Sequence, residues 1–378
     1  MIFRIDEFKN VCSTILSAID SSVGTVINET LELKVEDNSF IMAVTNREYY
    51  VKYKIEIPSV DEGFHATVNA NIFLKLISKI TTDTVELKAE GNSLIINGNG
   101  SYKLPMIFDG VNLLELPVID VLNPTINFPM DGNILLNISK YNLKQTRNAV
   151  KTPQFKCYVD EQGAYTFTSG ACVTKFSLVQ PVRMLLNQKL MKLLSLFKNK
   201  QVNFTMGYDA ASDSIIQTKV KFDDGTISIS AIISNNDAEL DSFPVNTIRK
   251  LAYNPYPYSV VLNREELVQI IDRLMLFPSA YNKKLWSKFV FSKDSVTIYD
   301  SADVNKESMY YSNNSSIEDE YEACIDFRDI KSVLESFTDQ YITFNFGGSV
   351  ASVICVGDVY FVIPEINEDE TYEEEDSE

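Results

Sequence analysis

The chain has 378 residues, of which 45% are hydrophobic and 23% are charged, and its formal net charge is −18. This composition is typical of a globular protein with two or three domains. The sequence has no apolar run long enough to span a bilayer and no basic-then-apolar leader, so we expect a cytoplasmic protein without a membrane partner. So acidic a chain is on average a poor ligand for nucleic acid, unless its bases are gathered in one place.

Few residues indicate redox, metal or hydrolytic chemistry. The cysteines are odd in number and scattered at apolar positions, so we expect reduced core thiols. His65 is the only histidine and lies in a strand-like run, and no phosphate-binding Gly-Lys-Ser/Thr loop occurs. We therefore expect no catalytic residue, no metal ion and no cofactor. The cysteines are Cys12, Cys157, Cys172, Cys324 and Cys355.

One helical pattern, with apolar groups at i, i+3, i+4 and i+7, recurs along the whole chain. Its copies begin at Phe8, Phe73, Leu143, Leu190, Leu267 and Ile330. Each copy follows a residue type that favours a helix N-cap. These predicted caps are Asp6, Asn69, Ser139, Asn187, Asn263 and Asp326.

Strand-like runs surround each predicted helix. One run precedes the cap, as at Phe64–Val68, Ile134–Ile138 and Tyr321–Ile325, and two or three runs follow the helix. After the last helix these runs are Tyr341–Phe346, Val350–Val356 and Val359–Ile363. The sequence therefore predicts an α+β protein built from repeated units of one strand, one helix and three strands.

Two proline-containing connections, around Asp109–Asp131 and Ser234–Pro257, are longer than the others and group the units in pairs. We expect the final segment, which carries eight acidic residues, to be disordered. The predicted domains are residues 1–115, 116–245 and 246–366, followed by the acidic tail at residues 367–378.

Basic residues gather on three of the predicted helices. The segments Asn69–Ile80, Ser139–Lys151 and Asn187–Lys200 contain ten bases and no acid. A single charge run is most often a solvated face, but three such runs favour a shared basic lining that holds a DNA backbone without sequence preference. The ten bases are Lys75, Lys79, Lys140, Lys144, Arg147, Lys151, Lys189, Lys192, Lys198 and Lys200.

Six stretches, taken in order, resemble the bacterial-type sliding clamps, the beta subunits of DNA polymerase III. They are MIFRIDEFKNVCSTI, FHATVNANIFLKLISKI, VELKAEGNSLIINGNGSYKL, TFTSGACVTKFS, DSFPV and GGSVASVICVGDVYFVIPEI. The resemblance implies the DNA-clamp fold, with three similar domains whose helices line a ring and whose sheets lie outside. It also implies a non-enzymatic processivity factor that forms a head-to-tail homodimer around double-stranded DNA and serves a replicative polymerase and a clamp loader.

The resemblance places two further sites on this sequence. The implied dimer interface brings Tyr102 and Leu104 of one copy against Met275, Leu276 and Phe277 of the other. The implied pocket takes a short hydrophobic peptide from partner proteins. Its residues are Thr168, Gly170, Val173, Pro244, Val350, Ser352, Phe361 and Ile363, with Ile248 as a looser match.

The chain departs from the clamp pattern in three places. Ala171 and Cys172 replace the usual His and Arg, the loop Asp20–Asn28 lacks the usual Arg, and the acidic tail extends past the usual end. These departures suggest a phage or a distant bacterium as the source. The alternative interpretation is a β-rich structural or assembly protein, such as a phage virion component, with no role in DNA sliding. An enzyme is the third interpretation.

Overall fold

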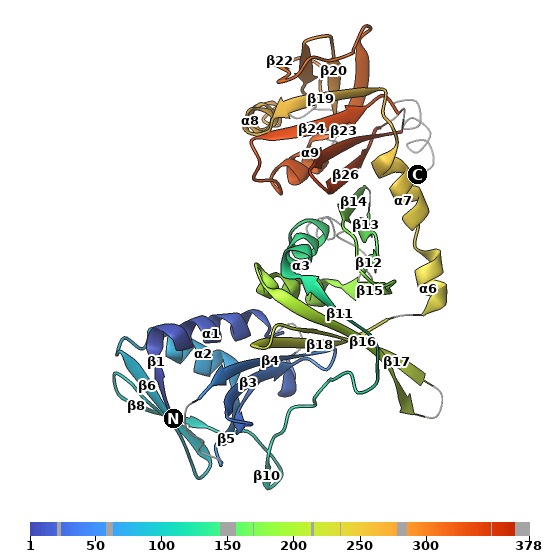
Figure 1. Cartoon of the computed structure of the whole chain (residues 1–378). Helices are drawn as coiled ribbons and strands as arrows, with labels where there is room; N and C mark the ends of the chain where they lie inside the picture. Colours follow the sequence, from blue (N-terminus) through green and yellow to red (C-terminus); the bar gives the residue numbers. More distant parts are fainter. Residues whose placement is uncertain are drawn as a thin grey trace, which may run out of the picture. The chain divides into compact units, whose positions relative to one another are not determined.

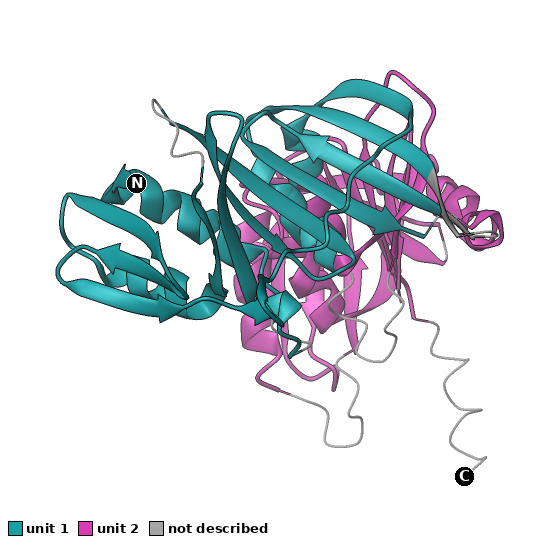
Figure 2. Ribbon diagram, turned by 90° about the horizontal axis from the view of Figure 1, so that it is seen from below, with its two compact units in different colours: residues 1–136, 189–235 teal, residues 137–188, 236–378 magenta. Residues whose placement is uncertain are grey.

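The computed structural model describes residues 1–20, 24–57, 63–143, 156–168, 170–212, 215–234, 236–277, 286–348 and 350–366. Its elements follow the chain in the order drawn in Figure 1. The chain divides into two compact units, each built from two stretches of sequence (Figure 2). Unit 1 contains residues 1–136 and 189–235, and unit 2 contains residues 137–188 and 236–378.

Unit 1 contains an antiparallel eight-stranded sheet with the strand order β11-β16-β17-β18-β4-β3-β2-β5. A four-stranded antiparallel sheet has the order β1-β6-β7-β8, and β9 and β10 form a small ribbon. The strands are β1 (Ile2–Arg4), β2 (Thr30–Glu36), β3 (Ser39–Thr45), β4 (Tyr49–Glu56), β5 (His65–Asn69), β6 (Thr84–Glu90), β7 (Ser93–Asn97), β8 (Ser101–Pro105), β9 (Phe108–Asp109), β10 (Asn112–Leu113), β11 (Pro124–Asp131), β16 (Gln201–Ser212), β17 (Ile215–Asp223) and β18 (Ile227–Ile233).

Unit 2 repeats this arrangement, with one eight-stranded sheet in the order β15-β12-β13-β14-β26-β25-β24-β19 and one four-stranded sheet in the order β22-β21-β20-β23. Its strands are β12 (Lys156–Asp160), β13 (Gly163–Phe167), β14 (Ala171–Lys175), β15 (Arg183–Asn187), β19 (Tyr258–Asn263), β20 (Trp286–Phe291), β21 (Ser295–Tyr299), β22 (Lys306–Tyr310), β23 (Tyr321–Asp326), β24 (Tyr341–Phe346), β25 (Ala351–Val356) and β26 (Val359–Pro364).

In each predicted repeat a helix directly follows the first strand, and further helices lie in the connections. In chain order they are α1 (Ile5–Ser17), η1 (Ile27–Glu29), α2 (Ala70–Lys79), α3 (Gly132–Asn137), the π-helical turn η2 (Ile138–Asn142), α5 (Gln188–Leu193), η3 (Leu194–Phe197), α6 (Asp237–Ser242), α7 (Val245–Tyr253), α8 (Arg264–Leu274) and α9 (Phe327–Leu334). The predicted α+β class, with paired strand and helix units, is confirmed.

Three predicted caps are confirmed by their geometry. The side-chain oxygens of Asn69, Asn263 and Asp326 accept hydrogen bonds from backbone N–H groups two or three residues ahead. The predicted cap at Asp6 is wrong, because α1 begins at Ile5 directly after β1 and Arg4 flanks it. The N-cap position there is Arg4, the last residue of β1, whose side chain makes no capping hydrogen bond.

The third helix begins earlier than the sequence pattern indicates, so the predicted strand Ile134–Ile138 and the cap at Ser139 are both wrong. The helix starts at Gly132, where a Cβ atom would lie 1.9 Å from the backbone oxygen of Phe197, and only glycine fits. The buried residues Leu135 and Ile138 are three apart, which is helical spacing and not strand alternation. The Asp-Gly-Asn sequence at residues 131–133 was the local sequence signal for the start of this helix.

Two helices lie in the connection Ser234–Pro257, for which the sequence analysis predicts no helix. The side chain of Asn236 caps α6 by accepting a hydrogen bond from the backbone N–H of Ala238. Helix α7 buries Ile248 and Ala252, four residues apart on one face. Residues 116–245 contribute strands to both units, and the three-domain division stays a prediction.

The cysteines are free, with Cys12, Cys157 and Cys172 buried and the other two partly buried. His65 lies in β5, where its Nε2 is 3.0 Å from Oε1 of buried Glu32. Among the described residues, no helix is long and apolar enough to cross a membrane. The same residues contain no group of three or more His, Cys, Asp or Glu side chains that could hold a metal ion.

Candidate functional sites

Helix α2 presents two of the predicted DNA-binding lysines to solvent. Phe73, Leu74 and Ile77 turn inward and are buried, so Lys75 and Lys79, four residues apart, lie together on the opposite face. Both lysines are exposed, and neither makes an ion pair with any residue that the structure describes. Both positive charges of α2 are therefore available to a ligand.

The second basic segment, α5 with η3, divides its lysines between solvent and internal ion pairs. Lys192 and Lys198 are exposed. The Nζ atom of Lys189 lies 2.7 Å from Oδ2 of Asp20 and 3.8 Å from Oε2 of Glu48. Lys200 pairs with Asp224, whose side chain is nearly buried. Lys189 and Lys200 are therefore largely neutralised within unit 1, which the sequence pattern did not indicate.

The third basic segment is only partly described. The Nζ atom of Lys140 is 3.0 Å from the hydroxyl of Tyr141 and lies 4.7 Å from the centre of its ring. Lys144, Arg147 and Lys151 lie outside the described residues.

The predicted peptide pocket falls at the junction between β14 and β26 in unit 2. These strands pair antiparallel, with Ala171 opposite Val362 and Cys172 opposite Phe361. Directly paired residues point to the same face of a sheet, and neighbours along a strand point to opposite faces. Strand alternation therefore divides the predicted pocket residues between two faces.

On one face, Val173 packs with Ile248 of α7 and with Val362. On the other face, Phe361 and Ile363 belong to the core that contains Tyr141 and Phe337. The ring of Phe361 lies 5.5 Å from that of Phe337. The structure does not bring Phe361 and Ile363 together with Val173 and Ile248. Val362 and the partly exposed Tyr360 lie on the same face as Val173. Strand alternation, counted from the pairing with β14, would therefore have selected these two residues for a pocket that contains Val173.

The remaining predicted pocket residues surround this junction. Thr168 and Gly170 lie just before β14, and the N–H of Thr168 donates to the carbonyl of Gly170 at 2.7 Å. Pro244 immediately precedes α7, and Val350 is 61% exposed. Ser352 is buried and donates to Oε1 of Glu365 at 2.6 Å.

Helix α7 covers the Val173 face of the junction. Val173, Val362 and Ile248 are all nearly inaccessible to solvent. Arg249 of α7 donates from Nη2 to Oδ2 of Asp160 at 2.5 Å and from Nε to the hydroxyl of Tyr165 at 2.9 Å. A peptide that used this face would have to displace α7 or bind at its margin.

The charged groups beneath α7 are perturbed by their burial. Desolvation raises the pKa of Asp160, although the N–H of Gln162 and the Arg249 guanidinium act in the opposite direction. Burial also raises the pKa of Tyr165 to about 12. Arg183 and Lys156, on the neighbouring strands, pair with Asp241 and Glu239 of α6. Ion pairs therefore fix both helices of this connection to the sheet.

The predicted dimer residues lie at the free edges of the two four-stranded sheets. Tyr102 and Leu104 belong to β8, the last strand of the unit 1 sheet. Leu276 and Phe277 follow α8 and are 73% and 50% exposed, while Met275 is partly buried. Arg273 of α8 holds Glu307 of edge strand β22 through two hydrogen bonds, at 2.8 and 2.6 Å, so this end of α8 lies beside β22.

The eight-stranded sheets show how such edges join within the chain. Four of the six predicted repeats end in a strand that pairs antiparallel with the last strand of another repeat, β4 with β18 and β14 with β26. Only β8 and β22, among the last strands that the structure describes, have an open side. Repeated half-sheets that join through their final strands, each carrying helices, define the class of DNA-clamp folds.

Within that class, solved structures of bacterial sliding clamps are similar to this chain in fold. The DNA polymerase III beta subunit from Pseudomonas aeruginosa matches 97% of this chain and 99% of its own, with a TM-score of 0.77 and 11% identity. The beta subunit from Thermotoga maritima matches 97% of this chain and 98% of its own, with a TM-score of 0.75 and 16% identity. The Helicobacter pylori beta clamp, solved bound to a DNA ligase peptide, matches 97% of this chain and 99% of its own, with a TM-score of 0.72 and 16% identity.

The sequence comparison agrees over a shorter stretch. The beta sliding clamp of Helicobacter pylori strain J99 is 26% identical over 136 residues, which are 36% of this chain. The match spans about a third of that curated relative, 35% of its length. No protein-family profile matches the chain. The chain thus has the fold of the DNA polymerase III beta sliding clamps and has diverged far from them in sequence.

Proposed function

We propose that this protein is a DNA sliding clamp, a cytoplasmic and non-enzymatic processivity factor that encircles duplex DNA as a homodimer. The observation that carries the proposal is the match of nearly the whole chain to complete bacterial clamps. The exposed lysines on α2 supply the sequence-independent attraction for the phosphate backbone that a sliding ring needs.

The open edges of β8 and β22 support a head-to-tail joint. Each eight-stranded sheet contains one junction at which the last strands of two predicted repeats pair. Pairing β8 of one copy with β22 of another would repeat this junction, which the fold already uses twice. The exposed side chains of Tyr102, Leu276 and Phe277 would then be covered. Burying each such group contributes about 1.5–3 kcal/mol.

Sedimentation tests the joint. We expect a species of about 86 kDa, twice the 42.8 kDa of one chain. Phe277→Asp should produce monomers, whereas Val179→Asp, which alters an exposed apolar residue away from both edges, should leave the dimer intact. A dimer that withstands Phe277→Asp would show that the joint lies elsewhere.

Retention on DNA tests the clamp. After loading, the protein should stay on circular duplex DNA and leave linear DNA through its ends. Lys75→Glu with Lys79→Glu should shorten retention without changing the sedimentation of the dimer. Equal loss from circular and linear DNA would favour the alternative, a β-rich assembly protein with no sliding role.

We further propose that a replicative polymerase and a clamp loader bind this chain through short hydrophobic peptides, by analogy with the ligase peptide on the Helicobacter pylori clamp. The surface nearest the implied pocket is the margin of α7, with Tyr253, Tyr360 and Val350 partly or fully exposed. A polymerase-derived peptide that protects Tyr360 and Val350 from solvent labelling would support this site. Protection confined to unit 1 would contradict it.

A further inference from the structure

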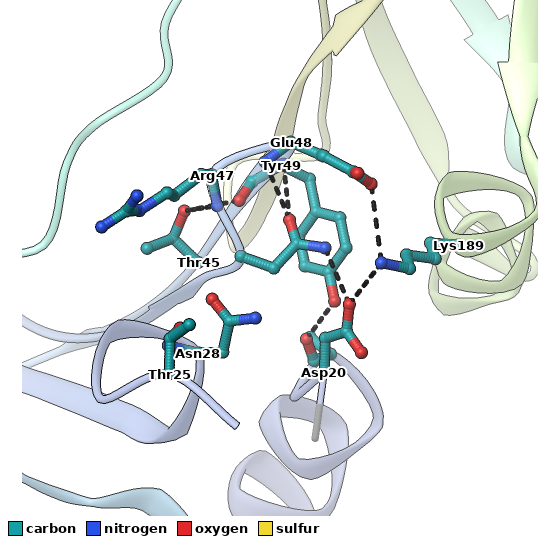
Figure 3. Close-up of polar contacts among 10 residues, drawn as sticks. Asp20, Thr25, Asn28, Thr45, Arg47, Glu48, Tyr49 and Lys189 are labelled. Carbon is teal, nitrogen blue, oxygen red and sulfur yellow. Dashed lines mark hydrogen bonds and ion pairs between the residues drawn. The ribbon is translucent and has the colours of Figure 1, made fainter. Parts of the chain in front are cut away.

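A polar network in unit 1 holds the turn between β3 and β4 in a fixed conformation (Figure 3). The side chain of Asn46 accepts hydrogen bonds from the N–H groups of Glu48 and Tyr49 at 3.0 and 2.9 Å. It also donates to Oδ2 of Asp20 at 3.1 Å. The hydroxyl of Thr45 accepts from the N–H of Arg47 and donates to the carbonyl of Tyr49. These side chains thereby hold the backbone N–H groups of Arg47, Glu48 and Tyr49 and the carbonyl of Tyr49 in place.

Two neighbouring helices anchor the same turn. The hydroxyl of Tyr49 donates to the carbonyl of Ala18, just past the end of α1, at 2.7 Å. Lys189 of α5 reaches both Asp20 and Glu48 (Figure 3). Asn46 and Asp20 are nearly buried, so this network excludes most water. The turn is therefore fixed relative to α1 and α5 within unit 1.

Arg47 occupies the tip of the turn in a left-handed conformation, with φ of +70°. The other described non-glycine residues with positive φ are Asp or Asn, whose short side chains tolerate this region. Arginine has no such tolerance, and a strained residue that its surroundings impose is a reason to look for function. Asn or Gly at this position would form the same turn without strain, so the turn itself does not need an arginine.

The charge of Arg47 meets no acidic partner among the residues that the structure describes. Its adjacent acid, Glu48, points to Lys189, and the Arg47 side chain extends from the turn away from that lysine (Figure 3). Arg47 is exposed and makes no ion pair with a residue that the structure describes. The network thus neutralises Lys189 and presents the Arg47 guanidinium on a fixed turn, with no counter-charge from the described part of the chain.

We infer that Arg47 is a DNA-phosphate contact and that Lys189 acts as a positioning residue for it. This inference rests on the proposed clamp function. A guanidinium binds a phosphate through two parallel hydrogen bonds, and a fixed turn loses little freedom when it does so. Lys189, which the basic helix pattern places in the DNA channel, instead fixes the turn through Asp20 and Glu48.

The test measures affinity for a fluorescent duplex DNA across a salt series. Each phosphate contact contributes about 0.9 to the slope of log affinity against log salt. Arg47→Asn should reduce the slope by about 0.9, whereas Arg47→Lys should keep most of it. Arg47→Asn should melt no lower than the wild type, because asparagine adopts this φ more readily. Arg47→Gly is the second uncharged variant and should match Arg47→Asn.

Two comparisons decide the outcome. The proposed clamp function by itself predicts that Lys75→Ala lowers the slope. If Lys75→Ala lowers the slope and Arg47→Asn does not, the role of Arg47 is overturned while the clamp function stands. If both slopes stay unchanged, the proposed function fails. Lys189→Met should weaken binding in the wild type but add nothing to Arg47→Asn. An additive loss would make Lys189 a phosphate contact itself and overturn its positioning role.

Discussion

The two eight-stranded sheets are joined in the same way but are covered differently. In both units the last strands of two half-sheets pair antiparallel. In unit 1 the junction is covered by irregular chain, whose Leu116 and Ile119 pack on Ile41, Ala43 and Tyr50. In unit 2 the cover is helix α7, held by a partly buried ion pair as well as by apolar contacts. The pairing of strands is the invariant part of this fold, and the cover is the part that can specialise.

The largest expected effect tests which face of the unit 2 junction belongs to the core. Ile363→Asp should unfold or strongly destabilise unit 2, because an unpaired charge in the core that contains Phe337 and Phe361 costs several kcal/mol. Chemical denaturation measures the loss. Val350→Asp, at an exposed position near the same junction, should change stability by less than about 0.5 kcal/mol. A fully stable Ile363→Asp variant would instead place this residue in an open pocket.

Shortening the unit 1 cover should have the next largest effect. Leu116→Ala removes a buried side chain and should lower the free energy of unfolding by about 3 kcal/mol. The loss should be the same at low and high salt, since the contact is apolar. Leu122→Ala, at a position 73% exposed on the same segment, serves as the control. A salt-dependent loss would mean that charges also hold this cover.

Breaking the ion pair under α7 should cost less and should depend on pH. Arg249→Met leaves Asp160 without its counter-charge, and because Arg249 is partly exposed we expect a loss of about 2 kcal/mol, below the range for fully buried pairs. The pKa of Asp160 is already raised by burial and rises further without Arg249. A raised carboxyl pKa favours the protonated folded state, so stability falls as pH rises through it.

Thermal unfolding of Arg249→Met from about pH 7 to about pH 5 checks the sign. The deficit relative to the wild type should shrink as the pH falls, and Asp160→Asn in the same chain should recover part of it. A deficit that grows toward acid pH would show that Asp160 is not the group responsible. The variant should also bind partner peptides more tightly if α7 must move to admit them.

The ion pairs of α6 should contribute little. Arg183→Ala breaks an exposed pair with Asp241 and should cost less than about 1 kcal/mol, with the effect vanishing at high salt. Denaturation at two salt concentrations measures both quantities. A large or salt-independent loss would point to the contact between the Arg183 Nε and the hydroxyl of Tyr158, at 3.3 Å, as the important one.

The smallest effect concerns the last residues of the sequence, 367–378, which carry eight acidic side chains. Deleting them should strengthen the binding of acidic peptides at low salt and weaken that of basic ones, because tethered charges act at high local concentration. The difference should fade near 0.1 M salt, where screening acts beyond about 10 Å. Unchanged affinity for both peptides would leave these residues without a role in partner choice.

Sequence periodicity predicted the strands and the helices whose buried faces are regular, such as α2, α8 and α9. It failed where a single close contact decides the structure. Gly132 starts a helix because Phe197 leaves no space for a side chain, and no local pattern contains that distance. The predicted peptide pocket stays a prediction, and the structure adds a constraint on it that the sequence could not supply. Phe361 and Ile363 have the right residue types, but their face is set by the register with β14, which is a property of two distant strands.

The ion pairs of the basic helices could not be predicted from the order of charged residues in the sequence either. Lys75 and Lys189 look alike in their basic segments. Among the described residues, however, only Lys189 of the two meets acids, Asp20 after the end of α1 and Glu48 in the β3–β4 turn. Counting lysines on a helix measures how much positive charge is present. Only tertiary structure determines how much of that charge remains for a ligand.

The open sides of β8 and β22 have a consequence for assembly. If β8 of one copy pairs with β22 of the next, a row of copies still has an unpaired β8 at one end and an unpaired β22 at the other. The joint itself therefore does not limit the number of copies. Whether the copies close into a ring depends on the angle between the two edges of one subunit. A change of that angle would yield open filaments instead of weaker dimers. Substitutions far from either edge can therefore alter stoichiometry, and electron microscopy of such variants would reveal fibres where affinity measurements reveal nothing.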